Sequence, residues 1–309
     1  MEQEFIRWLR QRVADDGRLT VPLGDDAAVL RLAQRADCVL AVDMITDQVD
    51  FDLATVDPRR IGRKALAVNL SDLAAMAARP VACLVALALP RQGALALAQE
   101  LLEGMIPLVA QYELMIAGGD TNTWNGPLAI SVTVVGETTG AQPLVRKGAR
   151  PGDAIVVTGQ FGGSILGRQF TFEPRVTEAL LLAEHYPLHA GIDVSDGLSL
   201  DLARLAEASG CGALVDLERV PIAPAARTLA EQLQDGATPL DHALTDGEDF
   251  ELILAMPAAA ADELLAVQPL ACGCTRIGTM IAEPGLWQVD GVGGRRPLAA
   301  RGYLHGGDP

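Results

Sequence analysis

The sequence contains only two lysines, Lys64 and Lys147, among its 309 residues. Acidic residues, in contrast, number 40, and several aspartates lie inside or at the ends of apolar runs. A carboxylate in an apolar environment costs free energy unless it is paired or holds a metal ion. Two lysines cannot pair with so many carboxylates, and no arginine lies inside these acidic segments. Bound divalent cations are therefore the economical explanation.

Histidine clusters, complete zinc-binding sets of cysteines and long apolar runs are also missing, which excludes further classes of protein. The four histidines are dispersed, so no histidine-based metal site or nucleophile is visible. The five cysteines are scattered, and Cys272-Gly273-Cys274 has no second pair or nearby histidine to complete a zinc site. We expect buried or incidental thiols, as in a reducing cytoplasm. No run of 18 apolar residues occurs, and the first ten residues predict a charged amphipathic helix that is not a signal peptide. These features predict a cytoplasmic protein.

The net charge of −16 and the pI near 4.6 argue against nucleic-acid partners and anionic membrane surfaces. The length is typical of two domains. A turn-rich stretch at residues 146–153 separates the halves, which predicts domains at residues 1–145 and 146–309. Alternating helical and strand patterns in both halves predict an α/β (α+β) fold. The expected strands are 39–45, 81–89, 114–116, 128–136, 154–158, 190–194, 213–217, 250–256 and 275–278, and the expected helices are 58–78, 93–112, 163–170, 174–184, 198–209 and 224–234.

The helix expected at residues 58–78 contains Asp72, the clearest example of an aspartate in an apolar segment. Its start is marked by Asp57 before Pro58, and its end by Pro80. Asp72 lies at helical spacing from Ile61 and Val68, on a face where its neighbours pack. The alternative is an acid that caps a helix or is buried and hydrogen-bonded. Hard cations such as Mg²⁺ suit carboxylates, and their usual companions are substrate phosphates.

Two glycine-rich segments have phosphate-binding and purely structural interpretations. Gly118-Gly119-Asp120 follows an expected strand, and its glycines allow a close backbone approach to a phosphate or a simple hairpin. Residues 157–164 resemble a phosphate loop at a helix start. No Lys-Ser/Thr follows, so the segment is not a P-loop, and we interpret it as a tight strand–helix turn. Asp196 is either a metal ligand or a helix N-cap. Glu248-Asp249 is either part of a binding site or a surface turn.

The ordered set of these motifs resembles the thiamine-monophosphate kinase family, within the aminoimidazole-ribonucleotide-synthetase-like ATP-binding superfamily. The resemblance covers nearly the whole chain, and its most specific parts are residues 64–76 and 193–198. The motifs are, in chain order, Gly24-Asp25-Asp26, Asp43, residues 64–76, Gly118-Gly119-Asp120-Thr121, residues 146–153, Asp193-Val194-Ser195-Asp196-Gly197-Leu198 and Gly247-Glu248-Asp249-Phe250-Glu251-Leu252.

The resemblance implies a two-domain PurM-like fold with mixed sheets flanked by helices, whose N-terminal domain binds ATP and Mg²⁺ and forms a barrel across a homodimer. It implies phosphorylation of thiamine monophosphate by ATP with several Mg²⁺ ions, and it leaves room for a monovalent cation. No covalent nucleophile or general base is implied. The implied metal ligands are Asp26, Asp43, Asp72, Asp120, Asp193 and Asp196. The implied ATP contacts are Gly119, Asp120, Arg146 and Ser195, and the implied substrate contacts are Asp50 and Glu248.

The sequence departs from the family pattern at three places, which belong to the implied acceptor-binding and metal-binding parts of the site. Asp50 stands where the family usually has a substrate-contacting histidine. Ala41 and Val42 replace a hydroxyl-bearing pair ahead of Asp43. Ala300 occupies the position of an aromatic residue that packs on the substrate. Alternatives to the thiamine-phosphate kinase are a related kinase with another phosphorylated acceptor, a carboxylate-metal phosphohydrolase, and a nucleotide-binding protein without catalysis. The selenophosphate-synthesis branch is disfavoured because no cysteine precedes Cys38, and the hydrogenase-maturation branch because the chain ends in Gly306-Gly307-Asp308-Pro309.

Overall fold

The computed structural model describes Trp8, Arg12 and residues 19–21, 29–30, 36–139, 143–289 and 294–304. Most of the expected N-terminal helix, and Asp25 with Asp26, lie outside the described residues. The chain divides into two compact units, residues 1–73 with 78–142 and residues 74–77 with 143–309. Within the described ranges, none of the helices combines the length and apolar character that crossing a bilayer requires.

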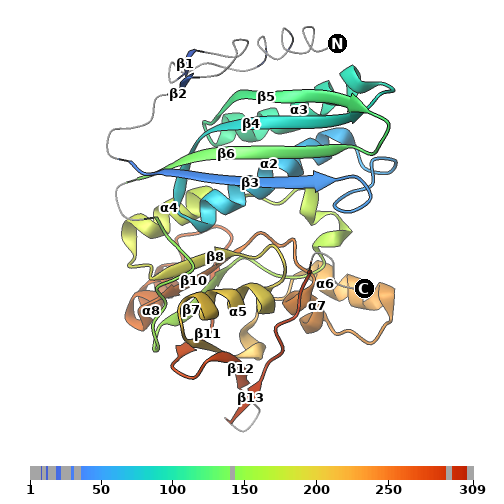
Figure 1. The fold of residues 1–309 in the computed structure, drawn as a ribbon. Coiled ribbons are helices and arrows are strands. Elements are labelled where there is room, and N and C mark those ends of the chain that lie inside the picture. The colour runs from blue at the N-terminus through green and yellow to red at the C-terminus, as the bar shows by residue number, and fades with distance from the viewer. Residues whose placement is uncertain are drawn as a thin grey trace. The chain divides into compact units, whose positions relative to one another are not determined.

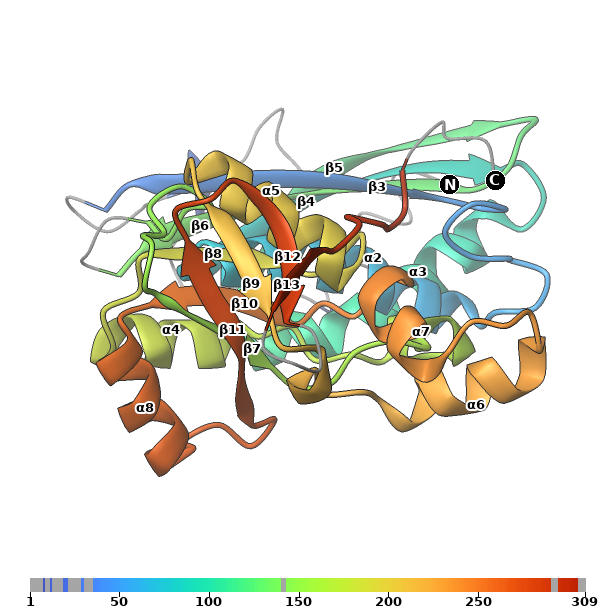
Figure 2. The ribbon, with the colours of Figure 1, turned by 90° about the horizontal axis from the view of Figure 1, so that it is seen from below.

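The first unit is built on a four-stranded mixed sheet with strand order β3-β6-β4-β5. Antiparallel pairs join β6 to β3 and to β4, whereas β4 and β5 are parallel. The helices α2 and α3 lie on the same side of this sheet (Figure 1; Figure 2). The bounds are β3 Cys38–Thr46, α2 Pro58–Ala75, β4 Ala78–Pro90, α3 Ala94–Gln111, β5 Met115–Trp124 and β6 Ala129–Thr138, with a short pair of β1 Leu19–Val21 and β2 Val29–Leu30 before them.

Helix α2 ends earlier than expected, at Ala75 instead of residue 78. Ala77 adopts a left-handed conformation (φ 49°), which breaks the helix, and β4 begins at the next residue. Pro80, expected to stop the helix, lies inside β4, where the register with β6 shifts. A proline cannot donate to the strand ladder and is tolerated at such an irregularity. The helix prediction was therefore wrong by about one turn.

Strand β5 does not end at the glycine pair but runs through it to Trp124. Gly119 pairs with Val85, and a Cβ at this position would lie 1.9 Å from the Val85 carbonyl oxygen. The glycine is thus needed for close approach of two parallel strands. The expectation that the strand stops at Gly118 was wrong, and so was the alternative of a glycine hairpin.

One face of this sheet exposes apolar side chains. Side chains alternate along β3, so Asp43 and Ile45 face α2 while Leu40, Val42 and Met44 face the other side. Those three side chains are 66%, 60% and 64% exposed. Contiguous apolar surface of this kind is typical of a protein–protein contact.

The second unit contains a seven-stranded mixed sheet with order β13-β12-β9-β11-β7-β10-β8. Its helix α5 packs against β8, β9 and β12, and α8 packs against β7 and β11 (Figure 2). The strands are β7 Ala154–Thr158, β8 Ala190–Asp193, β9 Gly212–Val215, β10 Leu252–Met256, β11 Cys274–Ile281, β12 Gly285–Val289 and β13 Arg295–Pro297. The helices are α4 Val176–His185, α5 Leu198–Ala208, α6 Pro224–Leu233, α7 Pro239–Thr245 and α8 Ala258–Val267.

Most expected elements of this unit are present within two residues of their predicted bounds. The expected helix at residues 163–170 is instead two short 3₁₀ helices, Ser164–Leu166 and Arg168–Phe170. The sequence patterns did not predict α7, α8, β12 or β13. The start of α7 had a readable signal, since Thr238 and Asp241 form a capping box before the helix.

The glycine-rich segment at residues 157–164 is the tight turn that the sequence predicted. Its amide groups bind the protein's own carboxylates: Gly162 N donates to both oxygens of Asp249 (2.9 and 3.0 Å), and Gly163 N donates to Asp246 (2.8 Å). Ser164 Oγ also donates to Asp249 (2.7 Å). These donors serve internal carboxyl groups, so the phosphate-loop interpretation does not hold for this turn.

Asp249 is fully buried, and burial raises the pKa of its carboxyl to about 7 from 3.8, against the lowering effect of the Ser164, Arg168 and Gly162 contacts. Between these values the folded protein keeps a proton that the unfolded chain has lost. Raising the pH through this window therefore lowers the free energy of unfolding. The quantity to measure is the melting temperature of the wild type minus that of Asp249→Asn. We expect this difference to fall by a few degrees between about pH 5 and about pH 8. A pH-independent difference in calorimetry would contradict the raised pKa.

Candidate functional site

Two of the predicted metal ligands, Asp43 on β3 and Asp72 on α2, form a carboxyl pair in the first unit. Their side chains are hydrogen-bonded to each other. Burial raises the pKa of Asp43, the bond with Asp72 lowers it, and the charge of Asp50 raises it again. Two carboxyl groups at hydrogen-bonding distance must share a proton or a cation. The pair is therefore suited to bind a cation, which would replace that proton.

Asn69 positions this pair, and sequence analysis assigned it no role. The side chain is fully buried on α2. Its Oδ1 accepts the backbone N–H of Asp43 (3.0 Å), and its Nδ2 donates to Ala65 O (3.0 Å). The amide thus joins the strand of one aspartate to the helix of the other. A buried polar residue one turn before Asp72 on an otherwise apolar helix is the signal that could have identified it.

Asp50 lies in the turn that follows β3. Its Oδ2 accepts from the backbone N–H of Thr46 (2.7 Å) and from the Thr46 hydroxyl (3.3 Å). Lys64, fully buried on α2, donates to the Asp50 carbonyl oxygen (2.9 Å). The aspartate therefore also shapes its own turn, close enough to Asp43 to affect its pKa.

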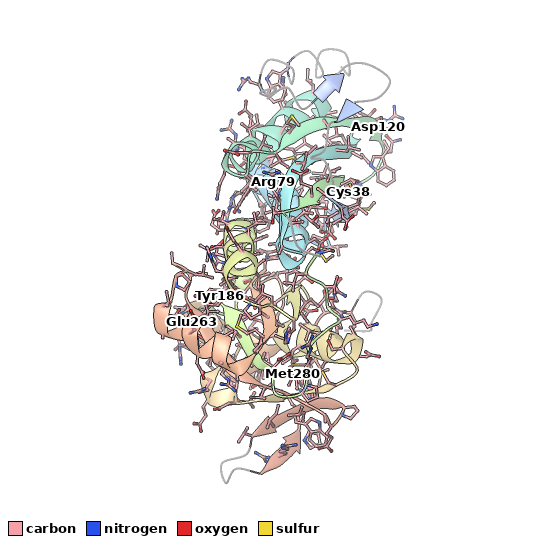
Figure 3. All side chains as sticks on the ribbon, turned by 90° about the vertical axis from the view of Figure 1, so that its left-hand side faces the viewer. Cys38, Arg79, Asp120, Tyr186, Glu263 and Met280 are labelled. Carbon is pink, nitrogen blue, oxygen red and sulfur yellow. The ribbon has the colours of Figure 1, made fainter. Side chains whose placement is uncertain are left out.

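Asp120, another predicted ligand, is not brought beside Asp43 within one chain. Asp43 on β3 is in register with Val85 on β4, and Asp120 on β5 pairs with Ala86, the next residue of β4. Because side chains alternate along a strand, and because Asp120 and Ala86 are exposed, the two aspartates face opposite sides of the sheet. Their strands are the two edges of the sheet, about 14 Å apart at three strand spacings. Figure 3 labels Asp120 on the edge strand β5. Gly119, the predicted ATP contact, lies on the same edge.

In the second unit, Asp193 and Asp196 both lie just before the start of α5. Asp193 is buried at the end of β8, and Asp196 follows in the loop. Arg204 Nη1 donates to Asp196 Oδ2 (2.5 Å) and to Asp201 Oδ1 (2.7 Å). The guanidinium of Arg204 therefore already balances part of the charge of Asp196.

Asp196 is not the N-cap of α5: that position is Gly197, without a side-chain cap, and Asp201 in the first turn binds the amides that precede the helix. The carboxylate of Asp201 accepts the amides of Asp196 (2.9 Å) and Gly197 (3.1 Å). Burial raises the pKa of Asp201 to about 6, partly offset by the Asp196 amide. The sequence did not indicate Asp201 or Arg204, because their partners are brought close only by the turn before α5.

Ser195 and Glu248 lie at the same loop, whereas Arg146 lies at the other end of α5, beside the C-cap residue Ser209. Glu248 N donates to Ser195 O (2.7 Å), so the predicted substrate and ATP residues are direct neighbours. Tyr303 N donates to Asp196 O (2.9 Å), which places the segment after Ala300 along the start of α5. Arg146 is exposed, and its carbonyl accepts the Ser209 hydroxyl (2.9 Å).

The described residues contain no group of three or more histidine, cysteine, aspartate or glutamate side chains placed to hold a metal ion. The carboxylates occur instead as pairs, Asp43 with Asp72 in one unit and Asp196 with Asp201 in the other. Cys272 and Cys274 are free thiols. Burial raises the pKa of Cys274 to about 12 and that of Cys272 as well, so neither is a ready thiolate ligand.

Comparison with known proteins identifies the family of the chain. Residues 24–138 match the model of the AIR synthase related protein N-terminal domain, and residues 150–287 match that of its C-terminal domain. The chain is similar to thiamine-monophosphate kinase of Rhodopirellula baltica, with 43% identity over 99% of this chain and 98% of that protein.

Solved structures show the same fold. The thiamine-monophosphate kinase of Stenotrophomonas maltophilia K279a superposes with a TM-score of 0.80, at 34% identity over 92% of this chain and 95% of that chain. A complex of AaThiL with AMPPCP and TMP gives a TM-score of 0.76, at 24% identity over 98% and 96%. The fold is thus the mixed α/β, two-domain PurM-like fold, and the chain belongs to the thiamine-monophosphate kinase family.

Proposed function

We propose that this enzyme, a phosphotransferase by its family, transfers the γ-phosphoryl group of ATP to the phosphate of thiamine monophosphate. An acceptor phosphate oxygen forms a bond to the γ-phosphorus, the bond to the β–γ bridging oxygen breaks, and ADP leaves with that electron pair. The products are ADP and thiamine diphosphate. The observation that carries the proposal is the Asp43–Asp72 carboxyl pair, because Asp72 belongs to one of the two most specific motifs of the resemblance, residues 64–76.

The carboxylates fit Mg²⁺. Asp43 and Asp72 need a shared proton or a cation, whereas a metal ion at Asp196 would have to share that carboxylate with Arg204. We assign Mg²⁺ to these residues and to Asp193, and by resemblance to Asp120 and to Asp26, which lies outside the described residues. When bound, the cations screen the repulsion between the ATP phosphates and the acceptor phosphate.

The protein residues supply binding and orientation in this proposal. The acceptor oxygen is already ionised near neutral pH, so no general base is needed. Gly119 and Asp120 on the β5 edge, Ser195 beside Asp196, and exposed Arg146 contact ATP, and Glu248 contacts the acceptor. Holding the two phosphate groups in line accounts for most of the rate enhancement.

A related kinase with a different phosphorylated acceptor is the second candidate, favoured by the departures on the acceptor side. Asp50 stands at a family histidine position, and Ala300, beside the segment that contacts Asp196, lacks an aromatic ring. Val42 bears less on this question, because it points away from Asp43.

The test is ADP release measured with ATP, Mg²⁺ and either thiamine monophosphate or other phosphorylated metabolites. The proposal requires ADP release that depends on thiamine monophosphate and yields thiamine diphosphate by chromatography. Turnover with another acceptor alone would support the second candidate. Phosphate release without any acceptor would identify a phosphohydrolase, and ATP binding without turnover would identify a protein that has lost catalysis.

Asp72→Asn should lower turnover by roughly 10²-fold or more, because it removes cation-binding charge without changing side-chain volume. The folded protein should persist, and the rise in melting temperature produced by Mg²⁺ with ATP should shrink. Asp57→Asn, an exposed substitution just before the same helix, is the matched control and should behave as wild type. Wild-type turnover in Asp72→Asn at saturating ATP would remove Asp72 from the metal site.

Asp50→Asn tests the acceptor side. Asparagine keeps an oxygen that can accept the Thr46 amide, so the turn should survive while the charge is lost. We expect the acceptor KM to change several-fold and the ATP KM to stay within about twofold, as for lost uniform binding of one substrate. Asp52→Asn, in the same turn, is the control. If both constants of Asp50→Asn match those of the wild type, Asp50 has only its structural role.

The exposed face of the first sheet supports a homodimer in which two such faces are joined. Leu40, Val42 and Met44 on the edge strand β3 and Leu84 on β4 supply the apolar surface. Light scattering should give about twice the chain mass of 32.5 kDa. Val42→Glu should shift the mass toward the monomer, whereas Val289→Glu, at a partly exposed site in the second unit, should not. A monomeric wild type would reject this assembly.

A further inference from the structure

The segment that carries Glu248 has an unusual backbone. Gly247, Glu248 and Phe250 all have positive φ, at 74°, 54° and 51°. The left-handed region is disfavoured for residues with a Cβ, and such conformations persist only where surrounding contacts fix them. Two non-glycine residues in this region within three positions therefore require strong local restraints.

Asp249, between the two strained residues, supplies one restraint. Its carboxylate is fully buried and is surrounded by donors from the glycine-rich turn: Gly162 N at 2.9 and 3.0 Å and Ser164 Oγ at 2.7 Å. Arg168 Nη1 adds a longer contact at 3.3 Å. The side chain at position 249 is thus anchored away from Glu248, which itself is only half-buried.

Glu251 supplies the second restraint from the other side of Phe250. It is almost fully buried, and Arg175 donates to both of its oxygens at 2.7 Å. Arg168 Nη2 donates to the same carboxylate at 2.5 Å. Arg168 therefore joins the two acidic anchors, and the Phe250 ring stacks on Phe172 with a centroid separation of 4.2 Å.

The backbone of the strained segment is also bonded to the loop that carries the other predicted contacts. Phe250 N donates to Val194 O (2.8 Å), and Glu248 N donates to Ser195 O (2.7 Å). A Cβ on Gly247 would lie 2.7 Å from Ser195 O, so the approach is close. Any movement of the Glu248 backbone would disturb Ser195 as well.

We propose that Asp249 is a positioning residue that, with Glu251 and Arg168, holds Glu248 in the left-handed conformation in which its carboxylate meets the phosphorylated acceptor. The inference rests on the proposed function, because it takes Glu248 as the acceptor contact. Asp249 touches no substrate in this arrangement; it acts through the backbone of its neighbour.

A double-mutant cycle on the acceptor KM tests this, with Asp249→Asn, Glu248→Gln and the double variant. Each single substitution should raise the acceptor KM about tenfold or more. If Asp249 acts through Glu248, adding Asp249→Asn to Glu248→Gln should change the KM by no more than about twofold. Asp153→Asn removes a different buried carboxylate of the same unit and is the matched control; it should lower the melting temperature without changing the KM.

Additive effects, or an unchanged acceptor KM in a folded but less stable Asp249→Asn, would overturn the positioning role. If Asp249→Asn does not fold, Ser164→Ala removes one donor to Asp249, and the same cycle with Glu248→Gln decides the question. A wild type that does not phosphorylate thiamine monophosphate would overturn the proposed function and this inference together. A wild type that does, with additive variants, overturns the inference alone.

Discussion

The need of each buried carboxylate for a donor organises this protein. With two lysines in the chain, that role falls on backbone amides, hydroxyl groups and a few arginines. In the second unit, Asp249 takes amides from a glycine turn, Asp201 takes amides at the start of α5, and Glu251 takes two guanidinium groups. Removing one partner of such a group leaves a costly unsatisfied charge, so these contacts specify the local backbone as well as stabilise it.

The carboxylates thus fall into two classes that differ in how their charge is balanced. Asp249 and Glu251 are surrounded by donors of the chain itself and have a structural role. Asp43 and Asp72 face each other, and a second carboxylate cannot neutralise the first. The second class is the one to which we assign a cation. Asp196 is intermediate, because Arg204 provides a positive charge at one of its oxygens.

The sequence could distinguish aspartates in apolar surroundings, but it could not separate these two classes. Helical spacing placed Asp72 on the packed face of α2, and strand alternation was enough to locate β3 and β6 closely. Prediction from the sequence failed where a tertiary contact determined the backbone conformation. Gly119 lies in a strand because Val85 approaches it, and the glycine turn binds Asp249, which is 87 residues away from Gly162 in the chain. Neither partner is visible in a local pattern. Asp201 escaped notice for the same reason.

The positions of the family departures suggest which half of the site is free to vary. Ser195 is bonded through its backbone to Glu248, and Glu248 is held by neighbours on both sides that have their own buried partners. A substitution in this network would disturb several contacts at once. Asp50 and Ala300, in contrast, lie in a turn and in an exposed segment. The Asp50 carboxylate accepts the Thr46 amide and hydroxyl, so a substitution there disturbs that one turn. The motifs around Ser195 and Glu248, which follow the family pattern, are thus held by buried carboxylates with distant partners, whereas Asp50 and Ala300 lie outside that network.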